Sequence, residues 1–97
     1  MAVLDGVWKV ERVGGLLPPL FGVHKRIQGH YGETKVGPLP GVSFRVHGMR
    51  LEYHAPFSGF VDLLEQQGDG YFGRATFRGR EYGQFRMRRE ATSEAKG

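Results

Sequence analysis

Six arginines gather between positions 74 and 89 of this 97-residue chain. They are Arg74, Arg78, Arg80, Arg86, Arg88 and Arg89. Phe72 and Tyr82 lie among them, and basic sheets with exposed aromatic side chains bind single-stranded nucleic acid by phosphate contacts and stacking. Polyanion binding by the hairpin face between Arg74 and Arg89, through Arg74, Arg78, Arg86 and Arg88, is therefore one candidate function. The alternative is a solvated surface, since Glu81 and Glu90 dilute the patch.

Four histidines are the residues that most readily suggest a metal site. They are His24, His30, His47 and His54, and their spacing contains none of the short pairs that place two ligands together. We interpret them as surface or turn residues. If one of them has a function, His24 or His30 is the better candidate, because both lie near an apolar loop.

Asp62 is the carboxylate in the least expected surroundings, within the mostly apolar segment 60–65. An inward carboxylate needs a partner, which would make it a functional candidate. Alternation instead favours Asp62 on the solvent face, with Val61 and Leu63 inward. No nucleophile–base pair or metal cluster can be named, so the sequence indicates no catalytic residues, no metal and no cofactor, and an enzyme is not favoured.

Composition is typical of one small soluble domain, with 39% hydrophobic and 25% charged residues, a net charge of +4 and no cysteine. We expect a single β-barrel domain over residues 1–89 and a disordered polar tail over 90–97. The first residues resemble no signal peptide and no run approaches a membrane span, which makes the cytoplasm the expected location.

About eight short segments with alternating or apolar patterns are separated by turn residues. They cover positions 6–13, 23–28, 33–36, 42–47, 50–54, 60–65, 71–78 and 81–88. This pattern predicts an all-β fold, a small antiparallel up-and-down β-barrel of about eight short strands. The segment 60–65 is also compatible with a single helical turn.

The best-defined local unit is a hairpin over positions 42–54. A two-residue Gly48-Met49 loop fits a type II′ turn. This register places Phe44 opposite Tyr53 and makes one face wholly apolar, so a slip of one residue would destroy the agreement. In the final hairpin, an odd loop or a bulge near Gly83 is needed to keep Ala75 and Phe77 on the apolar face of the following strand.

The segment from Leu16 to Gly22 is apolar but contains Pro18 and Pro19, which cannot donate to a β-ladder. It is therefore not a central strand. Three interpretations remain open for it: a lid over a barrel mouth, a short helical turn, or a contact between two subunits.

Gly6-Val7-Trp8 opens the first of these segments, and with the predicted barrel it resembles the lipocalin-like (calycin) superfamily. In that superfamily, a Gly-x-Trp places a tryptophan across the closed end of an eight-stranded barrel, and a basic residue of the last strand covers it. Here Arg86 or Arg88 would supply that residue. The resemblance implies a binder of small apolar molecules.

The leading hypothesis is therefore non-enzymatic binding of a small apolar molecule, by a protein that we expect to be a homodimer because so short a barrel has a shallow lumen. The candidate ligand-binding residues are Trp8, Leu20, Phe21, Phe44, Leu51, Tyr53, Phe77 and Phe85. Nucleic-acid or polyanion binding is the alternative, and a structural interaction module with a filled core is another.

Overall fold

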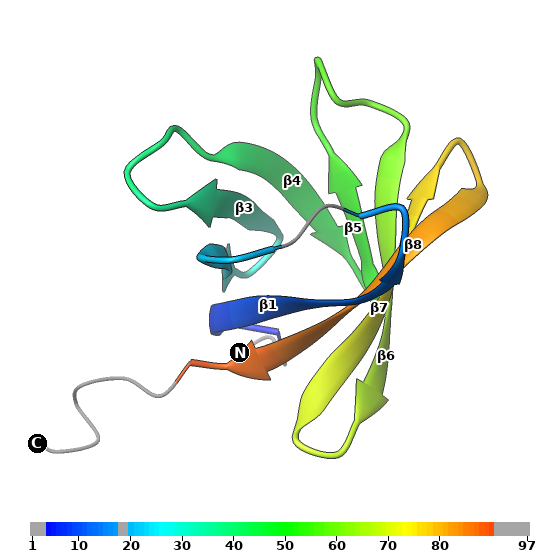
Figure 1. Ribbon diagram of the computed structural model, residues 1–97. Helices are drawn as coiled ribbons and strands as arrows, with labels where there is room; N and C mark the ends of the chain where they lie inside the picture. Colours follow the sequence, from blue (N-terminus) through cyan, green and yellow to red (C-terminus); the bar gives the residue numbers. More distant parts are fainter. Residues whose placement is uncertain (1–3, 18–19, 91–97) are drawn as a thin grey trace, which may run out of the picture.

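The structure is a computed structural model that describes residues 4–17 and 20–90 (Figure 1). Each strand pairs antiparallel with the next along the chain, and β1 pairs with β8, so the sheet closes into an up-and-down barrel. The strands are β1 (Gly6–Gly15), β2 (Val23–Gln28), β3 (Tyr31–Val36), β4 (Val42–His47), β5 (Arg50–Tyr53), β6 (Phe60–Gln67), β7 (Gly70–Phe77) and β8 (Arg80–Arg89). The prediction of an all-β barrel is confirmed, and segment 60–65 is a strand rather than a helical turn.

The barrel interior is filled by side chains of alternate residues, as expected for a sheet with one face buried. Trp8 and Val10 of β1, Phe44 of β4, and Phe85 and Met87 of β8 are all less than 5% exposed. The other buried apolar residues are Leu4, Val23, Ile27, Val46, Leu51, Leu64, Tyr71 and Ala75.

The predicted β4–β5 hairpin is confirmed residue by residue. Phe44 lies opposite Tyr53, and Arg45 lies opposite Glu52. Gly48 has a φ of +63°, the sign that the first central position of a type II′ turn requires.

The predicted irregularity in the β7–β8 hairpin is also confirmed. The register shifts between Ala75 and Thr76, so one extra residue of β8, Tyr82, lies between the partners Glu81 and Gly83. This bulge keeps Ala75 on the inner face with Phe85, as expected. The prediction for Phe77 is wrong: this ring is 39% exposed at the end of β7 and packs on Phe60, with ring centroids 4.6 Å apart.

Two glycines make room for two phenylalanine rings inside the barrel. A Cβ on Gly32 would come within 2.6 Å of the Phe44 ring, and a Cβ on Gly73 would overlap the Phe85 ring. Each aromatic ring therefore lies directly on the backbone of a neighbouring strand. At both positions a glycine on one strand leaves the space that a large ring on the next strand occupies.

The connections of an up-and-down barrel alternate between its two ends, and here the ends differ. Two-residue turns at 29–30, 48–49 and 68–69 form one end, which we call the closed end. The other end, the open end, carries the connections 16–22, 37–41, 54–59 and 78–79. In Figure 1 the 54–59 and 78–79 connections project away from the β6–β7 turn.

Trp8 seals the closed end. Its side chain is 1% exposed, its Nε1 donates a hydrogen bond to the Leu4 carbonyl (2.9 Å), and its ring meets Tyr71 edge-on. The covering basic residue is Arg89, whose guanidinium lies 4.3 Å from the Trp8 ring centre. The expectation of Arg86 or Arg88 is wrong because both are on the outward parity of β8, whereas Arg89 is the register partner of Trp8.

Candidate functional site

A cavity of about 340 Å³ occupies the open half of the barrel. All eight strands contribute to its lining, together with Leu17, Leu20 and Phe57 of the connections at the open end. The lining residues are Val10, Leu17, Leu20, Val23, Lys25, Thr34, Val42, Tyr53, Phe57, Phe60, Asp62, Ala75, Tyr82 and Phe85. The walls of this cavity combine a large apolar surface with a compact group of polar side chains.

Leu17 forms one side of the cavity mouth, and contacts with β1 and β8 fix its position. The Leu17 side chain sits where a Cβ on Gly83 would be, and Arg12 Nε donates a hydrogen bond to the Leu17 carbonyl at 2.7 Å. The Leu16 amide also bonds the Tyr82 carbonyl at 2.7 Å. This part of the apolar loop is outside the strands, as predicted, while the prolines 18 and 19 lie outside the described residues.

Lys25 is the central polar residue of the cavity. Its side chain is 4% exposed, and its Nζ contacts Thr34 Oγ1 at 2.7 Å, Tyr53 Oη at 2.6 Å and Asp62 Oδ2 at 3.3 Å. Tyr53 in turn donates to Asp62 Oδ2 at 3.1 Å. We call these four residues the polar cluster.

A buried ammonium group needs hydrogen-bond acceptors and negative charge around it to replace its lost hydration. Three oxygens match its three protons, and the rings of Phe44, Tyr53 and Phe85 have their centroids 5.3–5.5 Å from Nζ. Negative ring faces attract a desolvated cation more strongly than an exposed one. The polar cluster therefore holds a neutral ion pair inside an otherwise apolar cavity.

Protonation in the polar cluster is biased toward the ammonium form of Lys25. Burial by itself lowers the pKa of Lys25, but the interactions with Tyr53 and Asp62 outweigh burial and raise it above its ordinary value. Burial raises the pKa of the Tyr53 hydroxyl. Both groups accordingly keep their protons near neutral pH, and Lys25 has no lone pair for nucleophilic attack.

The prediction that Asp62 faces solvent is wrong. Asp62 is 6% exposed and points into the barrel, on the same parity as the buried Leu64. Val61 and Leu63 take the outward parity instead. The segment is apolar on both parities, so alternation alone misassigned the faces, and the carboxylate is inward because Lys25 compensates its charge.

Three of the eight predicted ligand-binding residues line the cavity: Leu20, Tyr53 and Phe85. Trp8, Phe44 and Leu51 are fully buried core residues outside its lining, at most 1% exposed. The remaining two, Phe21 and Phe77, are on the outer surface of the open end, and Phe21 is 87% exposed.

The sequence interpretation missed Lys25 and Thr34 as site residues. A signal was present for Lys25, because it shares its parity with Val23 and Ile27, the two inward residues of β2. A lysine between two core positions of one strand is unusual, since lysine is almost never fully buried without a partner. Thr34 carried no comparable signal.

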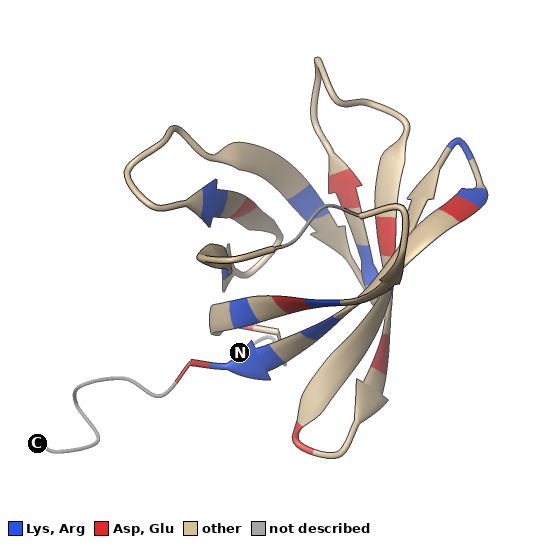
Figure 2. Cartoon of the chain, viewed as in Figure 1, with Lys and Arg blue, Asp and Glu red and all other residues tan. Residues whose placement is uncertain are grey.

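The arginine-rich hairpin face has mixed charge. Arg74 lies 3.7 Å from both Glu65 and Glu81, and Arg88 lies 3.4 Å from Glu11. Figure 2 shows acidic positions next to basic ones on β1 and β8. Polyanion binding through Arg74, Arg78, Arg86 and Arg88 stays a prediction, and these ion pairs lower the positive potential that it would need.

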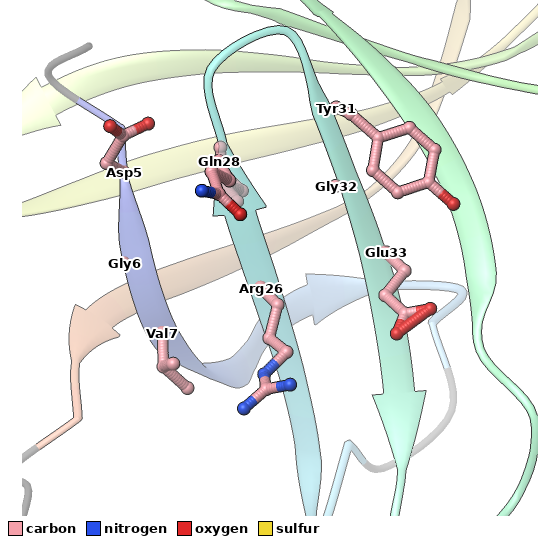
Figure 3. Close-up of a pocket in the computed structure, with 9 residues that line it drawn as sticks. Asp5, Gly6, Val7, Arg26, Gln28, Tyr31, Gly32 and Glu33 are labelled. Atoms are coloured by element: carbon pink, nitrogen blue, oxygen red, sulfur yellow. The ribbon is translucent and has the colours of Figure 1, made fainter. Parts of the chain in front are cut away.

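A second hollow lies on the outer surface of β1, β2 and β3 near the closed end (Figure 3). Arg26 of β2 and Tyr31 and Glu33 of β3 line this hollow together with Val7 of β1. Arg26 and Glu33 are direct cross-strand partners. Opposite charges at such positions stabilise a sheet, which accounts for these residues without a ligand.

Within residues 4–17 and 20–90, no three histidine, cysteine or acidic side chains come together as a metal site would require. His24 lies 3.4 Å from Glu90, and His54 Nδ1 lies 2.9 Å from Ser43 Oγ. The same residues include no helix long and apolar enough to cross a bilayer.

Comparisons of this chain with protein-family models, with curated proteins and with solved structures give no match.

Proposed function

We propose that this protein binds a small, largely apolar molecule in the cavity at the open end of its barrel. The observation that supports this proposal is the lining itself. Leucine, valine and aromatic side chains surround one compact polar cluster. Ligand sites typically combine apolar walls with a few placed polar groups that fix orientation.

The size of the cavity limits the size of the ligand. An engineered cavity of about 150 Å³ in another protein is large enough for benzene. At about 340 Å³ the present cavity is roughly twice that volume, so a molecule with two fused rings, or an aliphatic molecule of similar bulk, matches it. The lipocalin-like resemblance of Gly6-Val7-Trp8 supports the same class of ligand.

Titration with naphthalene, which is intrinsically fluorescent, tests this proposal directly. We expect saturable binding to the wild-type protein and its loss in Val42→Trp, because Val42 lines the cavity and an indole there would fill it. Arg45→Trp is the matched control: it adds the same ring on the same strand, but on the outer face.

Two results would overturn the proposal. One is the absence of saturable binding by the folded wild-type protein. The other is binding that Val42→Trp and Arg45→Trp reduce equally, since this would place the naphthalene on the outer surface. Circular dichroism of each variant confirms that a loss of binding is not a loss of fold.

A further inference from the structure

The polar cluster specifies which polar group the ligand carries. We infer that the cavity selects molecules with a neutral hydrogen-bond donor, such as a phenolic hydroxyl or an amide N–H, and that this donor bonds to Asp62 Oδ1. The inference rests on the proposed function and names the ligand class of the same cavity. A buried lysine in an apolar cavity would by itself suggest an acidic ligand, but the hydrogen bonds indicate the reverse.

The donors of the cluster are already used. Lys25 Nζ has three protons, and three oxygens lie within 3.3 Å of it. The single proton of Tyr53 goes to Asp62 Oδ2. Thr34 Oγ1 lies 3.0 Å from Tyr53 Oη, and with the Tyr53 proton committed to Asp62, the hydroxyl of Thr34 is the donor in that contact.

One acceptor remains. Both interactions of Asp62 within the polar cluster involve Oδ2, from Tyr53 and from Lys25. In the described part of the chain, every fully buried side-chain nitrogen or oxygen has a hydrogen-bond partner. Oδ1 has no such partner among these residues, so it is in contact with the cavity that Asp62 lines.

The charges of Lys25 and Asp62 distinguish between anionic, cationic and neutral ligands. The ion pair of Lys25 and Asp62 is neutral as a whole, so a carboxylate ligand would meet Oδ1 with like charge and find no free proton on Lys25. A cationic ligand would bring a second positive charge close to the Lys25 ammonium. A neutral donor avoids both penalties and satisfies Oδ1.

Three fluorescent probes of one size test the inference on the wild-type protein: 2-naphthol, naphthalene and 2-naphthoate. Since a hydrogen bond to a charged group is worth about tenfold in affinity or more, we expect 2-naphthol to bind about tenfold more tightly than naphthalene. We expect 2-naphthoate to bind more weakly than naphthalene. Equal binding of naphthol and naphthalene, or tightest binding of naphthoate, would overturn the inference and leave the proposed function standing.

Asp62→Asn supplies the second test. It removes the negative charge of Asp62 and leaves the positive charge of Lys25 uncompensated. We expect the order of affinities to change, with 2-naphthoate gaining on both other probes. An unchanged order would contradict the role of Oδ1.

If Asp62→Asn does not fold, the double variant Lys25→Met/Asp62→Leu replaces it, since it removes both charges together. In this variant naphthalene binding should persist, while the tenfold preference for 2-naphthol disappears. A preference that survives in the double variant would place the selecting group elsewhere in the cavity. If none of the three probes binds to the wild-type protein, the proposed function itself fails.

Discussion

The two ends of the barrel are closed by different means. At the closed end, the strands are joined by two-residue turns, and Trp8, Leu4 and Tyr71 fill the space between them. At the open end, longer connections lead over a cavity, and large apolar side chains remain in solvent. We call five of these the apolar rim: Leu16, Phe21, Leu39, Phe57 and Phe77, each at least 39% exposed.

This difference separates residues that hold the fold from residues that are available for function. At the closed end Trp8, Leu4 and Tyr71 form a packed plug that stabilises the barrel. The apolar surface of Trp8 is therefore already buried in the fold and is not available to a ligand. The apolar surface at the open end is left uncovered by the strands. The proposed binding site is therefore at the open end, although the most conspicuous sequence feature, Gly6-Val7-Trp8, lies at the other.

The largest effect is expected from removing the Trp8 ring at the closed end. For Trp8→Ala we expect the free energy of unfolding to fall by about 3–5 kcal/mol, because the substitution leaves a cavity and an unfilled barrel end. Phe21→Ala, an equally large apolar change in the apolar rim, should alter stability by less than about 0.5 kcal/mol. Urea unfolding monitored by circular dichroism measures both.

Similar losses for these two variants would mean that the apolar rim is packed in solution and that the ends do not differ. Since a domain of this size has a stability of only about 5–15 kcal/mol, we expect Trp8→Ala to leave less folded protein than the wild type. Trp8→Phe, which keeps a ring in the plug, should then fall between Trp8→Ala and the wild type.

The second test concerns the charged pair of Lys25 and Asp62, which is buried inside the barrel. Asp62→Ala leaves Lys25 with an uncompensated charge, and we expect a loss of about 3 kcal/mol, at the lower end for broken buried pairs because the cavity admits solvent. The double variant Lys25→Met/Asp62→Leu should recover most of this stability. If the single and double variants are equally unstable, the charges do not interact, and the polar cluster as described is wrong.

How far the sequence predicted the molecule depends on the contrast between the two parities of each strand. In the β4–β5 hairpin one parity is apolar and the other polar, so register, faces and turn all followed from alternation. The bulge near Gly83 followed from the same requirement. In β6 both parities are apolar around Asp62, so alternation carried no information and the carboxylate was placed outside.

The candidate site was less predictable than the fold because the residues that line the cavity come from all eight strands. Lys25 and Asp62 are 37 positions apart in the sequence, and nothing local to either one identifies the other as its partner. The structure places β2 and β6 on opposite sides of one lumen. Only closure of the barrel brings the two charges together, and closure depends on long-range pairing of β1 with β8.

Alkaline pH should weaken the open half of the barrel through the same cluster. The pKa of Lys25 is raised above 10.5 and that of Tyr53 above 10.0, so in each case the folded state holds its proton more tightly than the unfolded state does. Their contribution to stability is complete below about pH 10 and is lost as the pH rises through the folded-state values. The free energy of unfolding should therefore decrease above pH 10, and less steeply in Lys25→Met/Asp62→Leu. If the free energy of unfolding falls equally steeply with pH in the wild type and in the double variant, the alkaline loss of stability does not come from the polar cluster.

The smallest predicted effect tests which arginine belongs to the plug. Arg89 stacks on the Trp8 ring and its Nη1 donates to the Asp5 carbonyl at 2.8 Å. Because these contacts are partly solvated, we expect Arg89→Ala to cost about 1 kcal/mol and to shift the emission of Trp8 to longer wavelength as water reaches the indole. Arg88→Ala is the matched control, since Arg88 pairs with Glu11 on the outer face and exposed pairs contribute little. Arg88→Ala should change the free energy of unfolding by no more than a few tenths of a kcal/mol. It should leave the emission of Trp8 unchanged. A red shift in Arg88→Ala, but not in Arg89→Ala, would mean that β8 is offset by one residue against β1, and that the closed end is sealed by a different arginine.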